Sequence, residues 1–366
     1  MKNIFSFFQK NEIGEPPWDY YFLQNLDEKE YPKYLAKLFY LNTGEKLPLT
    51  HGGIDKKKLK TFNQKLQWIK LYGVTPLMRD CTDKVKVRDY VKEKIGEEYL
   101  KPVLQIIPNE SHETVRCHCE QVNDNLGLAR QSTEGSHDIP DCRADIIMSL
   151  SARNDRELND VSTYFDRINW DKLPNSFVIK TNHGCKWQYI IKNKNEVLNT
   201  KPFVDIIKRN VTGWLEQEYW VWNGFEMQYK GIKPKLIVEP LLREEIQVNP
   251  REIEVYCFKG KPKIIENVRY DKQREITYYN EDFSISDLLL NPDGRNFLLR
   301  KKADDFIKQT FVLSEALSQN FNFVRVDWLV FDNKLYFNEL TFTPYSGFIK
   351  FDKTWNKKIG NWIEIV

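Results

Sequence analysis

The pattern that most restricts the fold lies near the end of the chain. Phe323–Phe331 and Lys334–Leu340 are two apolar-rich runs joined by Asp332-Asn333. Two runs of strand length around a short Asn-containing turn predict a β-hairpin. Side chains two residues apart on a strand point to the same face. The polar residues of this hairpin therefore have predictable neighbours.

Each predicted strand carries two polar residues in that spacing. Arg325 and Asp327 lie on the first strand, and Glu339 and Thr341 lie on the second. If the two faces coincide, they gather two carboxylates, a hydroxyl and a guanidinium. Mg²⁺ takes carboxylate and phosphate oxygens in proteins, and arginine stabilises a transferring phosphoryl group. The alternative is a half-exposed hairpin with ordinary surface charges, and the residues alone leave both interpretations open.

The rest of the chain predicts an α+β fold, because strand-like and helix-like segments both occur. The predicted strands are Phe177–Lys180, Tyr189–Ile191, Leu236–Glu239, Glu252–Phe258 and Lys263–Val268, the last two around a turn at Lys259–Pro262. The predicted helices are Asp27–Tyr40, Lys60–Tyr72, Asp83–Ile95 after an N-cap at Thr82, and Ala303–Gln319.

The composition is that of a soluble globular protein. Of 366 residues, 55 are Lys or Arg and 52 are Asp or Glu, and a net charge of +3 gives no reason to expect a nucleic-acid partner. The sequence has no apolar run long enough to span a membrane and no signal-peptide pattern at its start. We therefore expect a cytoplasmic protein whose six cysteines are reduced thiols.

Three further positions are weak candidates when taken singly. Lys180 ends a predicted strand and precedes a glycine-containing loop, whose backbone N–H groups can cradle phosphates. Lys84 lies at a predicted helix start, from which it can reach phosphates. Glu239 ends a strand before Pro240, where a hinge can offer polar groups to an adenine. For each of the three, a solvated surface residue is the alternative interpretation.

Taken in order, these elements resemble the ATP-grasp proteins, and in particular the group related to the teichuronopeptide-biosynthesis protein TupA. The similarity covers about residues 50–107 and 165–366. The segments that carry it are Lys60–Trp68, Thr82–Val91, Lys172–Pro174, Lys180–Gly184, Trp187, Glu226–Lys230, Phe323–Asp327 and Glu339–Pro344.

The resemblance implies an ATP site in the first part of these segments. Lys84 and Lys180 would bind the phosphates of ATP, and Lys180 would also serve catalysis. His183 and Gly184 would belong to the phosphate loop, although a purely structural role for His183 stays open. Glu239, together with Leu242, would lie at the adenine hinge.

The resemblance also implies the roles of the hairpin residues. Arg325 would stabilise the transferring phosphoryl group, and Asp327 and Glu339 would hold Mg²⁺. Many ATP-grasp ligases have asparagine where this chain has Thr341, so the neutral hydroxyl is a weaker third ligand. Cys185 and Lys186 replace small residues that are expected in the phosphate loop.

The implied activity is that of an ATP- and Mg²⁺-dependent carboxylate–amine ligase, which forms an amide through an acyl phosphate. The implied substrates are an amino acid or amine and a uronic acid of a bacterial capsule or other surface polysaccharide, with a nucleotide-linked uronic acid as one option. Arg269 and Arg274 are candidates to hold the substrate carboxylate, with surface arginines as the alternative. A glycosyltransferase or sugar-modifying transferase that uses a nucleotide sugar is the alternative function.

The expected domain organisation has three parts. Residues 1–107 form a helical N-terminal region and a first ATP-grasp lobe, residues 108–164 form an inserted segment, and residues 165–366 form the nucleotide-binding lobes. The insertion holds four possible zinc ligands, which are Cys117, Cys119, His137 and Cys142. Their spacing matches no standard zinc finger, and reduced thiols in a lobe that shapes the acceptor site are the alternative.

Overall fold

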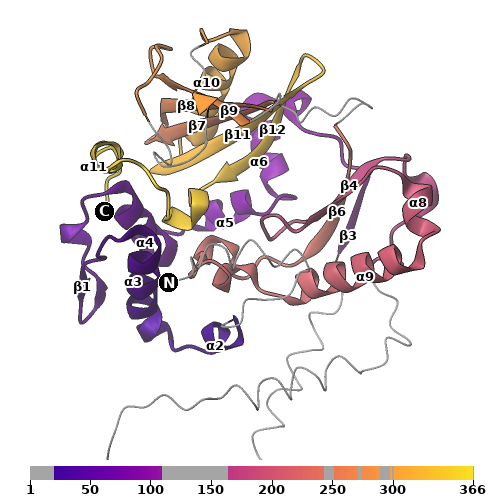
Figure 1. The fold of residues 1–366 in the computed structure, drawn as a ribbon, viewed down its shortest axis with the longest axis horizontal. Helices are drawn as coiled ribbons and strands as arrows, with labels where there is room; N and C mark the ends of the chain where they lie inside the picture. The colour runs from indigo at the N-terminus through magenta and orange to yellow at the C-terminus, as the bar shows by residue number, and fades with distance from the viewer. Residues whose placement is uncertain are drawn as a thin grey trace, which may run out of the picture.

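The computed structural model describes residues 20–108, 164–242, 251–270, 274–288, 297–298 and 301–365. The four possible zinc ligands and nearly all of the predicted insertion lie outside these ranges. The described part contains two larger sheets with helices packed on them (Figure 1), so the predicted α+β fold is confirmed. Among the described residues, no helix is both long and apolar enough to cross a bilayer.

The larger sheet has six strands in the order β10-β9-β8-β7-β11-β12. All its pairs are antiparallel except β9 with β10. The strands are β7 (Arg251–Phe258), β8 (Lys261–Tyr270), β9 (Arg274–Asn280), β10 (Phe297–Leu298), β11 (Phe323–Phe331) and β12 (Lys334–Thr341). Both predicted hairpins of the sequence are found in this sheet, as β7–β8 and β11–β12.

Helix α10 (Asp305–Ser318) covers one face of the six-stranded sheet (Figure 1). The side chain of Asp304 caps it by accepting a hydrogen bond from the Ile307 backbone N–H. Trp328, a buried residue of β11, donates from its indole nitrogen to the Ser314 hydroxyl at 2.9 Å. This contact holds the β11–β12 hairpin against the helix and leaves the polar residues on the opposite face.

The smaller sheet has four strands in the order β3-β6-β4-β5, all antiparallel. They are β3 (Gln105–Pro108), β4 (Phe177–Thr181), β5 (Gln188–Ile191) and β6 (Lys235–Pro240). Helices α8 (Lys194–Leu198) and α9 (Lys201–Glu216) accompany it (Figure 1). Ile207, Val211, Trp214 and Leu215 form the buried stripe of α9, which packs in one core with β4 and β6.

The remaining helices are α2 (Tyr20–Gln24), α3 (Tyr31–Thr43), α4 (Phe62–Tyr72), α5 (Pro76–Thr82), α6 (Val87–Ile95) and α11 (Lys353–Gly360), and a short pair of strands, β1 (Leu49–Thr50) and β2 (Gly53–Ile54), follows α3. Helix α4 begins with a complete capping box from Thr61 and Gln64. The predicted N-cap at Thr82 is wrong, because Thr82 ends α5 and its hydroxyl donates to the Met78 carbonyl. Lys84 therefore lies in the turn between α5 and α6.

The β11–β12 hairpin has two local irregularities. Asp332 and Asn333 both have positive φ, as a type I′ turn requires. The pairing also shifts register beside Asp327, because Asp327 pairs with Glu339 while Trp328 pairs with Phe337. A β-bulge at Asn338 results.

Candidate functional site

The hairpin brings its four polar residues together on one face, as predicted. Arg325 is opposite Thr341, and Asp327 is opposite Glu339. The Arg325 guanidinium donates two hydrogen bonds of 2.7 Å to the two carboxylate oxygens of Asp327. The Thr341 hydroxyl lies 2.9 Å from Asp327 Oδ2 and 3.1 Å from Glu339 Oε1. The four side chains thus form one connected group.

Glu254 is a fifth member of this group, which sequence reasoning missed. It lies on β7 directly beside Asp327, and its Oε2 is 2.9 Å from Arg325 NH1. Burial and the neighbouring acids Glu266 and Asp327 raise the pKa of Glu254 well above its ordinary value, against the pull of Arg325. The sequence shows that side chains alternate along β7, but it does not show that β7 pairs with β11, and this pairing is what places Glu254 in the site.

The two candidate metal ligands differ in their electrostatic surroundings. Burial raises the pKa of Asp327 to about 6, although Arg325 lowers it. Burial also acts to raise the pKa of Glu339, but Lys84 and Arg325 outweigh it and the pKa is lowered. The surroundings thus favour the ionised form more strongly at Glu339 than at Asp327.

The oxygen atoms of Asp327, Glu339 and Thr341 fit Mg²⁺, and they would fill part of its coordination shell. No three His, Cys, Asp or Glu side chains in the part of the chain that the structure describes are arranged to hold a metal ion by themselves. Asp327, Glu339 and Thr341 offer oxygen atoms from one face of one hairpin. Mg²⁺ is usually bound in this way, with few carboxylates and with phosphate or water oxygens in its other positions.

A second charged group faces the hairpin from the smaller sheet. The Lys180 ammonium at the end of β4 lies 2.6 Å from a carboxylate oxygen of Glu239 on β6. Lys101, which the sequence analysis did not select, lies 3.5 Å from the same oxygen and donates to the Asn338 side-chain carbonyl at 2.9 Å. Burial and the neighbouring Lys180 lower the pKa of Lys101 to about 8.

The pKa of Glu239 reflects the opposing effects of burial and of these two lysines. Burial acts to raise it, but Lys180 and Lys101 together lower it below its ordinary value. Glu239 is therefore ionised and holds two cations in place. Leu242, the other predicted hinge residue, lines the same cavity as Glu239.

The predicted phosphate loop lies beside Lys84, and its residues Cys185 and Lys186 line both cavities of the site. The Lys84 ammonium donates to the backbone carbonyl of Gly184 at 2.5 Å. A Cβ at Gly184 would lie only 2.4 Å from the Trp187 ring, so the loop requires glycine there. Cys185, the next residue, is exposed.

His183 is oriented into the protein rather than along the loop surface. The side chain is 2% exposed. Its Nε2 lies 3.1 Å from the Trp214 carbonyl and 3.2 Å from the Gln217 carbonyl, and its Nδ1 lies 3.3 Å from Asn182 Oδ1. This geometry favours the structural role that the sequence left open.

Two cavities meet at the hairpin. The smaller, about 510 Å³, is lined by Lys84, Lys101, Lys180, Glu239, Leu242 and Asp327 among others. The larger, about 1950 Å³, extends from the hairpin toward Trp222 and Glu226. The residues that line both are Cys185, Lys186, Gln188, Glu254, Arg325 and Glu339. Arg325 thus lies where the smaller cavity meets the larger one.

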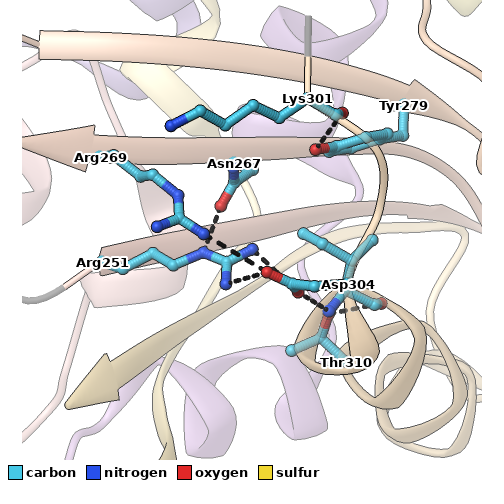
Figure 2. A network of polar contacts seen from close by, with 8 residues as sticks. Arg251, Asn267, Arg269, Tyr279, Lys301, Asp304 and Thr310 are labelled. Atoms are coloured by element: carbon cyan, nitrogen blue, oxygen red, sulfur yellow. Dashed lines mark hydrogen bonds and ion pairs between the residues drawn. The ribbon is translucent and has the colours of Figure 1, made fainter. Parts of the chain in front are cut away.

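Arg269 and Arg274 do not come together. Arg269 faces α10, where its NH2 is 3.3 Å from Asp304 Oδ2, in a network with Arg251 (Figure 2). Arg274 lies on the opposite face of the sheet, 3.4 Å from the buried Glu266 carboxylate. Strand alternation points the two side chains to opposite faces, so they do not hold one carboxylate together, and a substrate role for either arginine alone stays a prediction.

Several solved structures show a distant likeness to this chain. D-alanine–D-alanine ligase from Bacillus anthracis complexed with ATP is 13% identical, with a TM-score of 0.32 over 79% of this chain and 64% of that chain. N5-carboxyaminoimidazole ribonucleotide synthetase from Thermus thermophilus is 9% identical, with a TM-score of 0.29 over 72% and 45%. The ATP-grasp ligase PsnB complexed with minimal precursor, Mg and ADP is also 9% identical, with a TM-score of 0.29 over 76% and 57%. The chain thus spans less than two thirds of the length of each of these three proteins.

The family comparison is more direct. No curated protein sequence matches the chain. A family model described as TupA-like ATPgrasp matches residues 143–364, which is more than half of the chain. The match includes the hairpin, Lys180 and Glu239, whereas Lys84 and the resemblance over residues 50–107 fall outside it. The protein therefore belongs to the TupA-like ATP-grasp family.

Proposed function

We propose that this protein is an ATP- and Mg²⁺-dependent carboxylate–amine ligase that forms an amide bond. A substrate carboxylate oxygen attacks the γ-phosphorus of ATP, so that ADP leaves and an acyl phosphate forms. An amine then attacks the carbonyl carbon, inorganic phosphate leaves, and the nitrogen loses a proton. ATP supplies the activating phosphoryl group, and the protein's own residues position and neutralise charge.

The single observation that supports this proposal is the position of Arg325. It is 8% exposed, it is paired with two acids, and it borders both cavities. Phosphoryl transfer concentrates negative charge between the nucleotide and the acceptor, and a fixed guanidinium at that point stabilises it. In this proposal the nucleotide occupies the smaller cavity and the other substrates enter the larger one.

The remaining roles follow from that arrangement. Lys84 and Lys180 would bind phosphate oxygens, and Asp327 and Glu339, with Thr341 as a neutral third donor, would hold Mg²⁺. Glu239 and Leu242 would border the adenine. The domain division proposed from the sequence fits this use, with residues 1–107 contributing Lys84 and Lys101 and residues 165–366 contributing the other groups.

For the substrates, we propose a uronic acid of a bacterial capsule or surface polysaccharide, joined in the cytoplasm to an amino acid or amine. This choice rests on the family resemblance. The test is ADP release with ATP, Mg²⁺, UDP-glucuronic acid and a pool of amino acids. Release that requires both the acid and the amines supports the ligase.

The glycosyltransferase alternative is separated by the same reaction mixture. A transferase would release a nucleoside diphosphate from the nucleotide sugar without consuming ATP. Sugar-nucleotide turnover without ATP turnover under any pairing of acid and amine would overturn the ligase assignment. Arg325→Lys is a useful companion variant, because a lysine keeps the charge but loses the two-pronged geometry and should lower turnover strongly.

A further inference from the structure

One wall of the larger cavity is rich in aromatic side chains. Aromatic side chains gather there from the phosphate loop and from the two short 3-10 helices η7 (Tyr219–Val221) and η8 (Met227–Tyr229). Trp187 packs edge-on against Trp222 with ring centroids 5.3 Å apart, and Tyr219 contacts Tyr229 at 4.6 Å. The four aromatic rings all line the cavity.

A buried acid stands beside this aromatic wall. Glu226 is 5% exposed, and one of its carboxylate oxygens accepts a hydrogen bond of 2.5 Å from the Thr343 hydroxyl. Gln228 donates to the same hydroxyl at 2.6 Å. Thr343 follows β12 by two residues, so this network is fixed to the end of the hairpin that carries Arg325.

A buried lysine, Lys70, lies close enough to Glu226 for the two charges to interact: burial lowers the pKa of Lys70 to about 7, although Glu226 raises it. Lys70 of α4 is fully buried and donates to the backbone carbonyls of Asn223 and Ser346 and to the Ser346 hydroxyl, at 2.9 to 3.1 Å. Lys70 does not line the cavity, whereas Glu226 does. Three separate sequence motifs, around Lys70, Glu226 and Thr343, thus meet at this part of the cavity wall.

Two polar atoms in this wall have no hydrogen-bond partner within the described residues. They are Gln228 Oε1, on a side chain that is 2% exposed, and Trp222 Nε1. A buried polar atom without a partner costs free energy unless a ligand or water meets it. The wall therefore contains an unpartnered amide oxygen, a carboxylate, π faces and the unpartnered indole N–H of Trp222.

This combination selects for a positively charged amine. Carboxylate and amide oxygens accept hydrogen bonds from ammonium groups, and aromatic faces attract cations. The basic residues that line the same cavity come from other segments, namely Lys60, Lys186, Arg325, Lys350, Lys353 and Lys357. Lys84 and Lys180 line only the smaller cavity of the two, and Arg325 lines both.

We propose that Glu226, Gln228 and the Trp222 ring form the subsite that binds the ammonium group of the amine substrate. The inference rests on the proposed ligase function and names which wall receives the amine. A primary amine bound there shares its cavity with Arg325, beside which the acyl phosphate would form.

Calorimetric titration of the full chain with a matched pair of probes tests this subsite without knowledge of the acid. Glycine ethyl ester carries an ammonium group, and ethyl glycolate carries a hydroxyl in its place. The wild-type protein should bind the amine at least about tenfold more tightly than the neutral probe. Trp222→Leu and Glu226→Gln should abolish that preference, and Trp222→Phe should keep part of it.

Two controls guard against loss of folding. Gln228→Met removes the unpartnered oxygen with little change in volume and should weaken only the amine. Trp170→Leu changes a tryptophan that packs in the core of the smaller sheet outside both cavities, and should leave the preference unchanged. Equal binding of both probes by the wild-type protein, or a preference kept in Trp222→Leu and Gln228→Met, would overturn the inference.

Hydroxylamine separates this inference from the ligase proposal. It is small and mostly uncharged at neutral pH, so it should trap an acyl phosphate as a hydroxamate without using the ammonium subsite. Wild-type hydroxamate formation with ATP and UDP-glucuronic acid, and its persistence in Trp222→Phe, tests the ligase alone. Its failure would count against the proposed reaction or acid, while the probe titrations would still decide the subsite.

Discussion

Replacing Lys101 with methionine should stabilise the protein while weakening nucleotide binding. Lys101 lies in the irregular chain before β3 and is held between Glu239 and Asn338 at the wall of the smaller cavity. Methionine keeps most of the aliphatic stem and removes the ammonium. The variant therefore isolates the free-energy cost of keeping this charge out of water.

The magnitude follows from the pKa of Lys101. Burial lowers it from 10.5 to about 8, and this difference corresponds to about 3 kcal/mol of folding free energy lost at neutral pH. The methionine variant also leaves the Asn338 carbonyl without its donor, which costs about 1 kcal/mol or more. A net gain of about 1–2 kcal/mol in the free energy of unfolding is expected.

The pH dependence has a definite sign. Between pH 8 and 10.5 the unfolded chain binds more protons at Lys101 than the folded chain does, so the free energy of unfolding of the wild-type protein rises with pH there. Lys101→Met should lack this contribution. Urea unfolding at pH 7 and pH 9.5 measures both effects.

Nucleotide affinity supplies the other half of the test. If the ammonium contacts phosphate, Lys101→Met should weaken Mg²⁺–ADP binding by about tenfold or more in calorimetry. Lys194→Met is the matched control, because Lys194 donates to the Trp170 and Leu173 carbonyls away from both cavities and should lose stability without losing affinity. A Lys101→Met protein that is less stable at pH 7, or that binds ADP like the wild type, refutes the reasoning.

Three further changes probe other parts of the site. Asp327→Asn combined with Glu339→Gln should abolish the Mg²⁺ dependence of ADP binding while far-ultraviolet circular dichroism stays unchanged; undiminished Mg²⁺ dependence contradicts the metal assignment. Gly184→Ala should weaken ADP binding about tenfold or more, because the added methyl overlaps the Trp187 ring, and wild-type affinity would show that the loop adjusts freely. Arg269→Ala should change unfolding by about 1 kcal/mol or less and leave turnover unaltered, since its ion pair is part-exposed and faces α10; a large loss of turnover argues for a substrate role.

Local signals in the sequence were sufficient for the hairpins. The Asp332-Asn333 turn and the two-residue spacing from Arg325 to Asp327 fix which side chains share a face, and the structure pairs them accordingly. Helix α9 (Lys201–Glu216) was not predicted, although its buried residues repeat at helical spacing. The local sequence pattern is enough to predict the hairpins, and it would also have been enough to predict α9.

Other parts of the site depend on contacts that are distant in sequence. Lys101 lies shortly before β3, and no sequence motif around it indicates a functional role. It joins the site only because Glu239 and Asn338 contact it from two different sheets. Glu254 belongs to the site because β7 pairs with β11. Thr82 was a reasonable N-cap by residue type, but α5 already extends through it.

The bulge at Asn338 adds one residue to β12 between two pairs that face opposite sides of the sheet. On one side of it, Phe337 pairs with Trp328 in the core against α10, and on the other side, Glu339 pairs with Asp327 in the site. Deleting Asn338 would make Phe337 and Glu339 sequence neighbours, which a regular strand points to opposite faces, so both could keep their partners. The extra residue is therefore not needed to place Phe337 and Glu339, and what it adds to the protein is the side chain that accepts from Lys101 beside the smaller sheet.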